Sequence, residues 1–257
     1  MEALIVVSLL LAVAVITSFF LLRSSEPENV SNPSSVTPPP EVSLVGPPKL
    51  IDSPKPVVIS SLLPQQFIVL DLETTGLNPL VDEIIEFGAI HVSLDSDTHK
   101  SFQTLVKPKR KVPRKITEIT GITQEMVDTE GIELIDALTE FIEFIGDLPI
   151  VTYNAEFDMG FIHNAARGQG IIINNRYACA LKRARRAWPT LPSHRLAYLA
   201  EVGGLPNDDA HRALGDCMRA LTVFVSATTI LNQKVRWSKP PAEFATQLKV
   251  DAPSGNS

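Results

Sequence analysis

Cysteine and net positive charge are both scarce in this sequence. Only Cys179 and Cys217 occur among 257 residues, which excludes a secreted fold held together by disulfides and fits two free thiols in a reducing compartment. The formal net charge is −6, so overall charge does not indicate a nucleic-acid-binding protein. A site for divalent cations also concentrates carboxylates, however, so the acidic total leaves that function open and local patches matter more than the sum.

The N-terminal residues 1–23 differ from the rest in being almost entirely apolar. Ala3 to Leu22 are twenty consecutive uncharged residues, which at about 1.5 Å per residue span a membrane as one helix. A cleaved signal peptide is the alternative, but no basic residue precedes the run and the run is longer than a usual signal core. Arg23 follows directly, and the positive-inside rule then places the remaining chain in the cytoplasm. We expect a single-pass membrane anchor.

Residues 24–64 and 232–257 lack the periodicity of helices or strands. The first segment contains ten of the twenty prolines, which favours an extended, semi-rigid linker without a partner of its own. The second has two adjacent prolines and a polar end, which favours a flexible tail. Residues 65–231 are left to form one folded domain.

Strand-like and helix-like patterns follow one another within residues 65–231. Short apolar or alternating runs predict strands at 66–70, 83–93, 101–106 and 148–153. Apolar residues at helical spacing predict helices at 130–145, 155–167, 177–187, 194–202 and 211–231. Early strands followed by strands interleaved with helices indicate an α/β domain with a mixed sheet.

The first of three acidic motifs is FIVLDLETTGLNP. Asp71 and Glu73 stand two residues apart at the end of an apolar strand, so both carboxylates project from the same face. Carboxylates of this kind bind hard cations such as Mg²⁺, and the turn at Gly76 lets a backbone approach a ligand closely. A pair of acids on a strand is more often a solvated surface, so this motif alone does not define a site.

The other two motifs lie on predicted helices. Asp158 falls among apolar neighbours in VTYNAEFDMGFI, where a buried carboxylate needs a partner, although an exposed acid at a helix start explains it equally well. His211 precedes Asp216 by five residues, which on an ideal helix separates the side chains by about 140°. We therefore expect His211 at the helix entrance, where an imidazole near metal-bound carboxylates can act as a general base.

Together the motifs D-L-E-T-T-G at 71–76, Y-N-A-E-F-D at 153–158 and H-R-A-L-G-D at 211–216 resemble a known family. They look like the DnaQ-like 3′-to-5′ exonucleases with four acids and a histidine, the family of the bacterial polymerase III proofreading subunit. The resemblance covers residues 65–231. It implies a ribonuclease H-like α/β domain with a mixed five-stranded sheet and flanking helices, which removes nucleotides from the 3′ end of DNA or RNA.

The family pattern implies a role for each matched residue. Two Mg²⁺ or Mn²⁺ ions would be held by Asp71, Glu73, Asp158 and Asp216, and His211 would take a proton from the attacking water. Contacts with the substrate would come from Thr74, Leu77, Asn154 and Phe157. Tyr153 stands where the family often has a histidine, and this departure leaves substrate choice open.

Two basic stretches are candidates for guiding single-stranded nucleic acid, with a solvated charge run as the alternative for each. The first comprises Lys107, Lys109, Arg110, Lys111, Arg114 and Lys115, and the second comprises Lys182, Arg183, Arg185 and Arg186 with Trp188. Such patches give salt-sensitive affinity without sequence preference.

Three functions fit the sequence. The first is an exonuclease acting on single-stranded 3′ ends, tethered by its N-terminal helix to the bacterial inner membrane with the catalytic domain in the cytoplasm. The second is a catalytically silent nucleic-acid-binding or scaffold module, which the presence of all five polar positions disfavours. The third is a polymerase-associated proofreading subunit. Association with a polymerase or a sliding clamp stays open, and no residue pattern decides between DNA and RNA.

Overall fold

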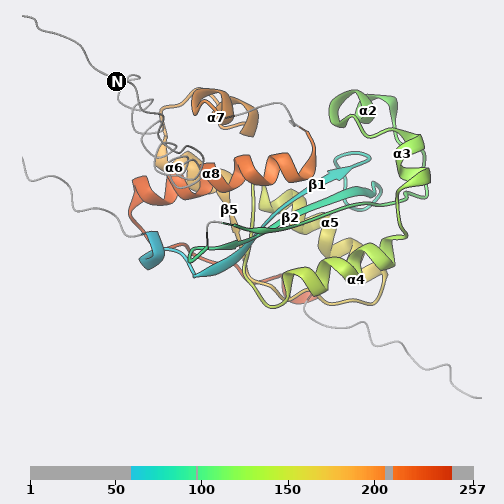
Figure 1. Ribbon diagram of the computed structural model, residues 1–257, viewed down its shortest axis with the longest axis horizontal. Helices are drawn as coiled ribbons and strands as arrows, with labels where there is room; N and C mark the ends of the chain where they lie inside the picture. The colour runs from blue at the N-terminus through green and yellow to red at the C-terminus, as the bar shows by residue number, and fades with distance from the viewer. Residues whose placement is uncertain (1–58, 97, 206–210, 245–257) are drawn as a thin grey trace, which may run out of the picture.

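The computed structural model describes residues 59–96, 98–205 and 211–244 (Figure 1). The expected membrane helix at residues 1–23 and the expected linker as far as residue 58 lie outside the described residues. Both cysteines are free thiols, as the sequence predicts.

A five-stranded mixed sheet forms the centre of the domain in the order β3-β2-β1-β4-β5. The central strand β1 (Gln66–Thr74) is antiparallel to β2 (Ile84–Ser93) and parallel to β4 (Ile150–Thr152). At the two edges, β3 (Lys100–Leu105) is antiparallel to β2, and β5 (Tyr177–Cys179) is parallel to β4. This arrangement confirms the predicted mixed five-stranded α/β domain.

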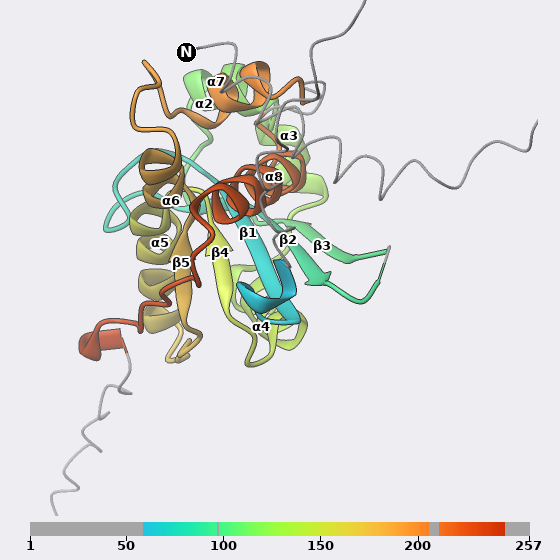
Figure 2. The same ribbon diagram turned by 90° about the vertical axis from the view of Figure 1, so that its left-hand side faces the viewer.

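Helices cover both faces of the sheet (Figures 1 and 2). One face carries α4 (Leu134–Ile145) and α5 (Ala155–Gly168). The other carries α8 (Ala213–Leu231), with α6 (Ala180–Ala187) and α7 (Leu196–Val202) packed beside it. The apolar core therefore lies in two layers, one on each side of β1.

Alternation along β1 decides which side chains meet which helices. Phe67 and Val69 pack in the α8 layer, whereas Ile68 packs in the α4 and α5 layer. Successive side chains of a strand point to opposite faces, so Asp71 and Glu73 continue the Phe67 series and face α8. The strand thus presents both acids to the helix that carries the third acidic motif.

The long helix α8 is part of the core. Among the residues that the structure describes, it is the one helix long and apolar enough to cross a membrane, and 50% of its apolar stretch is buried inside the domain. Phe224 is fully buried, and its ring centre lies 6.3 Å from that of Phe67. A helix that buries so much of its surface against a sheet is typical of the interior of an α/β domain.

The structure contains two short helices between β3 and α4 where the sequence predicts none. They are α2 (Arg114–Thr120) and α3 (Gln124–Thr129). The Thr123 side chain caps α3 by accepting a hydrogen bond from the amide of Met126 at 3.2 Å. Each helix is too short to show a full apolar stripe, and each is stabilised by capping and by a separate small apolar cluster.

The folded domain begins earlier than residue 65. A short helix, η1 (Ile59–Ser61), turns the chain so that Leu63 is buried and Ile59 packs against the α8 layer. The last residues assigned to the linker therefore belong to the core, because their apolar side chains cover the end of that layer.

Part of the segment expected as a tail also packs onto the domain. Tyr177 and Ser238 exchange two backbone hydrogen bonds, of 3.0 and 2.8 Å, at the outer edge of β5. Val235 and Trp237 lie against the α8 layer, and a final short helix, η2 (Ala242–Phe244), follows. Ser238 thus pairs with the outer edge of the sheet, which the sequence pattern does not indicate.

The helix predicted at 177–187 is correct only from Ala180 onward. Residues Tyr177–Cys179 form β5 instead, because they pair with β4 and with Ser238 on either side.

Candidate active site

The acids of the first and third motifs meet at one place. One carboxylate oxygen from each of Asp71, Glu73 and Asp216 lies within 4.8 Å of the other two, and all three residues are partly exposed. Asp71 and Glu73 end β1, and Asp216 stands in the first turn of α8. Three hard oxygen donors at this spacing, open to solvent, fit a divalent cation such as Mg²⁺.

Asp158 lies beside this group, but its carboxylate is turned to a different partner. Its side chain is buried, and its Oδ2 accepts a hydrogen bond of 2.8 Å from the Thr152 hydroxyl on β4. Its charge still raises the pKa of Asp71, so the two carboxylates are neighbours. The structure therefore brings three of the four expected acids together, and the fourth, Asp158, lies beside them with its carboxylate bonded to Thr152.

Burial and mutual repulsion raise the pKa values of these carboxyl groups. Burial, then the charges of Asp158 and Asp216, raise the pKa of Asp71 well above its ordinary value. Burial, then Asp216 and Glu86, raise the pKa of Glu73 to about 8, and burial raises the pKa of Asp158 to about 7. Without a cation these groups keep protons near neutral pH, and a divalent cation would displace those protons.

Asp216 is also held from within its own helix. Arg219, one turn further along α8, pairs with the Asp216 carboxylate at 2.8 Å, and both side chains are largely buried. A pair of this kind fixes the direction of the carboxylate.

The N-terminal end of α8 rests directly on β2. Gly88 is the pairing partner of Asp71 across the sheet, and a Cβ at this position would come within 2.5 Å of the backbone carbon of Ala213. The buried Cys217 thiol donates to the Gly88 carbonyl at 3.2 Å. Glycine is required here because the helix backbone occupies the space of a side chain.

Glu86 provides a second attachment for α8, which sequence reasoning missed. Its fully buried carboxylate pairs with Arg212 at 2.6 Å and accepts hydrogen bonds of 3.0 Å from the Ala213 amide and from Gln103 Nε2. A carboxylate at a helix N-terminus is also favoured by the helix dipole. A charged residue within the apolar strand IIEFGAI was the available signal.

His211 lies immediately before α8, with its side chain exposed. Arg212 is the N-cap, so the helix begins two residues later than expected. The φ angle of His211 is 61°, a left-handed conformation that costs a non-glycine residue on the order of 1–3 kcal/mol. His211 therefore occupies the turn that leads into the helix carrying Asp216.

The residues expected to contact the substrate lie at two places, where β1 ends and where α5 begins. Leu77 is 83% exposed in the loop after β1, and the buried Thr74 holds that loop by donating from its hydroxyl to the Gly76 carbonyl at 2.6 Å. Asn154 is exposed immediately before α5, and Phe157 is half-buried in its first turn.

Tyr153, which departs from the family pattern, has a structural role. Its hydroxyl donates to the His194 carbonyl, and its own carbonyl accepts a hydrogen bond of 2.9 Å from the Leu181 amide. It therefore joins the end of β4 to α6 and to the loop before α7.

The two basic stretches have different surroundings. In the first, the backbone amides of Lys109 and Arg110 donate to the Glu83 carboxylate at 3.1 and 3.0 Å, which ties the loop to the start of β2. In the second, Arg183 and Trp188 are buried. Two members of the second stretch therefore pack inside the domain, and only its remaining basic residues can form a surface patch.

A mixed five-stranded sheet whose central strand ends in acids facing a helix is the ribonuclease H-like nuclease fold. Residues 68–224 match the RNase_T family model, described as Exonuclease. The chain belongs to this family, and its relatives confirm the resemblance to DnaQ-like 3′-to-5′ exonucleases.

Among its relatives, the chain is similar to the DNA polymerase III subunit epsilon of Aquifex aeolicus. The two are 36% identical over 176 residues, which cover 67% of this chain and 86% of that protein. The chain is also 37% identical over 170 residues to the PolC-type DNA polymerase III of Clostridium perfringens, covering 65% of this chain but 12% of that protein. It thus spans only a small part of the PolC-type relatives.

A solved structure of E. coli ExoI with single-stranded DNA shares the fold. Its TM-score is 0.57 at 23% sequence identity, covering 64% of this chain and 40% of that one.

Proposed function

We propose that this chain is a metal-dependent 3′-to-5′ exonuclease that removes nucleotides from the 3′ ends of single-stranded nucleic acid. The observation that carries the proposal is the convergence of Asp71, Glu73 and Asp216 within 4.8 Å in a chain of the exonuclease family. The similarity to the epsilon subunit and the single-stranded DNA in the ExoI complex support this substrate class.

The residues of the site have two proposed roles, metal binding and proton transfer. Asp71, Glu73 and Asp216, with Asp158 beside them, would hold two Mg²⁺ or Mn²⁺ ions, which when bound stabilise negative charge on the attacking and leaving oxygens of phosphodiester hydrolysis. His211 at the entrance of α8 accepts the proton of the attacking water.

The exposed Leu77 offers an apolar surface to the terminal base, and the rigid turn at Thr74 presents backbone beside it. Asn154 and Phe157 complete the proposed substrate contacts from the side of α5. Together these residues hold the last nucleotide against the acids, so that only a strand end fits.

The test follows single-stranded oligomers labelled at either end, with Mg²⁺ present. A 5′ label should give a ladder of products that shorten by one nucleotide at a time, and a 3′ label should appear first as a mononucleotide. Excess EDTA should stop both. Cleavage that persists in EDTA, or products cut internally, would contradict the proposal. Matched DNA and RNA oligomers then show which sugar is preferred.

A second candidate function is proofreading beside a polymerase, favoured by the 36% identity to an epsilon subunit. A proofreading enzyme removes a mispaired 3′ end faster than a paired one, because a mispaired end frays into a single strand. Equal rates on the two primers would argue against it.

We also propose that residues 1–23 anchor the domain in the bacterial inner membrane, with the catalytic domain in the cytoplasm. The uncharged run from Ala3 to Leu22 supports this. The full-length protein should stay with membranes after a high-salt wash, whereas a shortened protein starting at Ile59 should not. Recovery of the full-length protein in the soluble fraction would contradict the anchor.

A further inference from the structure

Two segments that are distant in the sequence form a concentrated positive surface. Residues 176–188 and 232–239 together contain eight Lys and Arg and no Asp or Glu, in a chain whose net charge is −6. The eight are Arg176, Lys182, Arg183, Arg185, Arg186, Lys234, Arg236 and Lys239. A local excess of one sign on an oppositely charged protein marks a surface for a charged partner.

Specific contacts hold the two segments side by side. Tyr177 and Ser238 pair through their backbones. Arg183 donates to the Gln233 carbonyl, and Arg186 Nη2 donates to the Gln233 side-chain oxygen at 2.7 Å. The positive surface is therefore built by the fold rather than by chance proximity.

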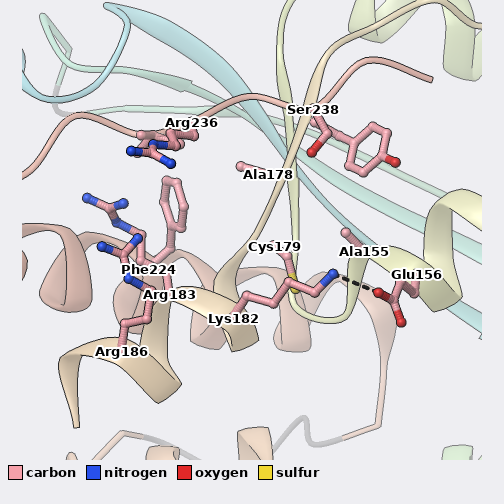
Figure 3. Close-up of a pocket in the computed structure, with 12 residues that line it drawn as sticks. Ala155, Glu156, Ala178, Cys179, Lys182, Arg183, Arg186, Phe224, Arg236 and Ser238 are labelled. Atoms are coloured by element: carbon pink, nitrogen blue, oxygen red, sulfur yellow. Dashed lines mark hydrogen bonds and ion pairs between the residues drawn. The ribbon is translucent and has the colours of Figure 1, made fainter. Parts of the chain in front are cut away.

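A cavity of about 220 Å³ lies between these segments (Figure 3). Arg183, Arg186 and Arg236 gather on one side of it, and Lys182 stands on the other side, paired with Glu156 at 2.6 Å. The aromatic ring of Phe224 forms part of the wall. We call this cavity the basic pocket.

The arginines of the basic pocket lack carboxylate partners within the described part of the chain. Arg183 is only 6% exposed, yet its partners are the Thr228 hydroxyl at 2.7 Å and the Gln233 carbonyl. Burial and the charge of Arg186 lower the pKa of Arg183, which shows that the two cations repel each other. Buried charge without a counter-charge is costly, and a bound anion would offset that cost.

We propose that the basic pocket binds backbone phosphates of the nucleic-acid strand, several nucleotides on the 5′ side of the end held at the acidic site. Arginine suits this role because its planar fork pairs with phosphate through two hydrogen bonds. A strand is favoured over a small anion because the eight cations extend beyond the pocket along both segments. The placement of the pocket on the 5′ side of the bound end rests on the proposed exonuclease function, which puts the 3′ end at the acidic site.

Helix α8 sets the distance between the two sites. Asp216 belongs to the acidic site, and Thr228, which contacts Arg183, lies twelve positions further along the helix. At 1.5 Å per residue this is a rise of about 18 Å. With stacked nucleotides about 3.4 Å apart, a strand must be on the order of five nucleotides long to reach from one site to the other. A trinucleotide should therefore not reach Arg183 and the arginine side of the basic pocket, whereas a 20-mer should.

The experiment compares two double variants that each remove two positive charges. One is Arg186→Ala with Arg236→Ala in the basic pocket, which leaves the buried Arg183 in place. The matched control is Lys100→Ala on β3 with Arg167→Ala near the end of α5, because both residues are exposed and lie outside the two basic stretches. Binding of a fluorescent single-stranded 20-mer to the full-length protein is measured in EDTA over a range of salt concentrations, so that the result does not depend on catalysis.

The pocket variant should bind the 20-mer about tenfold more weakly, and the slope of log K against log salt should fall by about 0.7 for each phosphate that is no longer neutralised. In Mg²⁺, its kcat/KM should fall about tenfold for the 20-mer and less than about twofold for a trinucleotide. The control should bind within about twofold of the wild type.

Two results would overturn the inference. Equal losses in both double variants would mean that overall charge matters and the pocket does not. Displacement of the 20-mer by an equal concentration of mononucleotide would assign the pocket to a free nucleotide instead of a strand. A protein that binds through the pocket but cuts no oligomer would refute the exonuclease function and leave this inference standing.

Discussion

The acidic site and the basic pocket both gather like charges, and they relieve the repulsion by different means. Carboxyl groups can take up protons, and the pKa of Glu73 rises to about 8. A guanidinium keeps its proton in a protein, so Arg183 relies on the neutral oxygens of Thr228 and Gln233. The acidic site should therefore respond to pH and divalent cations, whereas the basic pocket should respond to salt and polyanions.

The largest expected effect comes from removing one charge of the acidic site. Asp71→Asn should reduce kcat/KM by at least about 10³-fold, because a carboxylate that would hold the metal ions is lost and with it their stabilisation of the developing negative charge. Binding of a 20-mer in EDTA should be unchanged or slightly tighter, since the basic pocket is intact and a negative charge is gone. Single-turnover cleavage and strand binding measure the two effects. If Asp71→Asn weakened strand binding as much as cleavage, the acidic site and the basic pocket would not have separate roles.

The next largest effect should come from the strained residue before α8. His211→Ala should reduce single-turnover cleavage of a 3′-labelled oligomer by about 10²- to 10⁴-fold, the usual contribution of a positioned acid-base group. Strand binding and metal binding should stay close to wild type. Asp216→Ala is the contrasting variant, because it should weaken metal binding itself. An unchanged single-turnover rate for His211→Ala would exclude this residue from the mechanism.

A third variant tests the attachment of α8, the helix that joins the two regions. Arg212→Ala leaves the buried Glu86 without its ion-pair partner, which should lower the free energy of unfolding by on the order of 3 kcal/mol. Cleavage should fall about 10- to 100-fold, as for residues that hold ligands in place. Arg212→Lys restores a charge but not the two-pronged contact, so its losses should be intermediate. Wild-type activity in Arg212→Ala would contradict the positioning role of the pair.

A fourth prediction concerns the pH dependence of stability without metal. The pKa values of Glu73 and Asp158 are raised to about 8 and about 7, so the folded protein binds these protons more tightly than the unfolded chain does. The resulting stability is complete below about pH 4 and is lost as pH rises through 7 to 8. In EDTA, Tm should fall by about 5 °C between pH 6 and 8. Mg²⁺ should reduce this fall, and a flat profile in EDTA would refute it.

The smallest expected effect has the opposite sign and concerns a buried histidine on α5. His163 on α5 is buried against Phe244, with ring centres 4.8 Å apart, and its Nε2 has no hydrogen-bond partner among the residues that the structure describes. Burial lowers its pKa to about 4, so stability is lost as pH falls from about 6.5 to 4. Between pH 7 and pH 5 the Tm of the wild type should fall by about 2 °C more than the Tm of His163→Phe, which has no imidazole to protonate. An equal change at both pH values would contradict this.

Sequence reasoning succeeded where a local pattern determines the outcome. The apolar run before Asp71 predicts a strand, and its period of two places Asp71 and Glu73 on one face, as the structure confirms. The central helices 134–145, 155–168 and 213–231 were predicted from their apolar spacing, with ends that differ by a few residues.

Sequence reasoning failed where the outcome depends on contacts between distant segments. Nothing local reveals that residues 232–238 cover the edge of β5, or that Tyr177 belongs to a strand rather than a helix, because sheet pairing decides both. The role of Glu86 depends on Arg212, more than a hundred residues later. The sequence could not show that Asp158 turns to Thr152, since that hydrogen bond joins two elements.

The alternation along β1 also limits how this protein can change by insertion or deletion. One extra residue between Val69 and Asp71 would reverse the face of every later side chain of the strand. Asp71 and Glu73 would then point into the apolar layer of α4 and α5, and Leu72 would take a place beside Asp216. A single codon added there would unfold the core and dismantle the acidic site together, so we expect length changes in this family to be found in the loops around β1 and not within it.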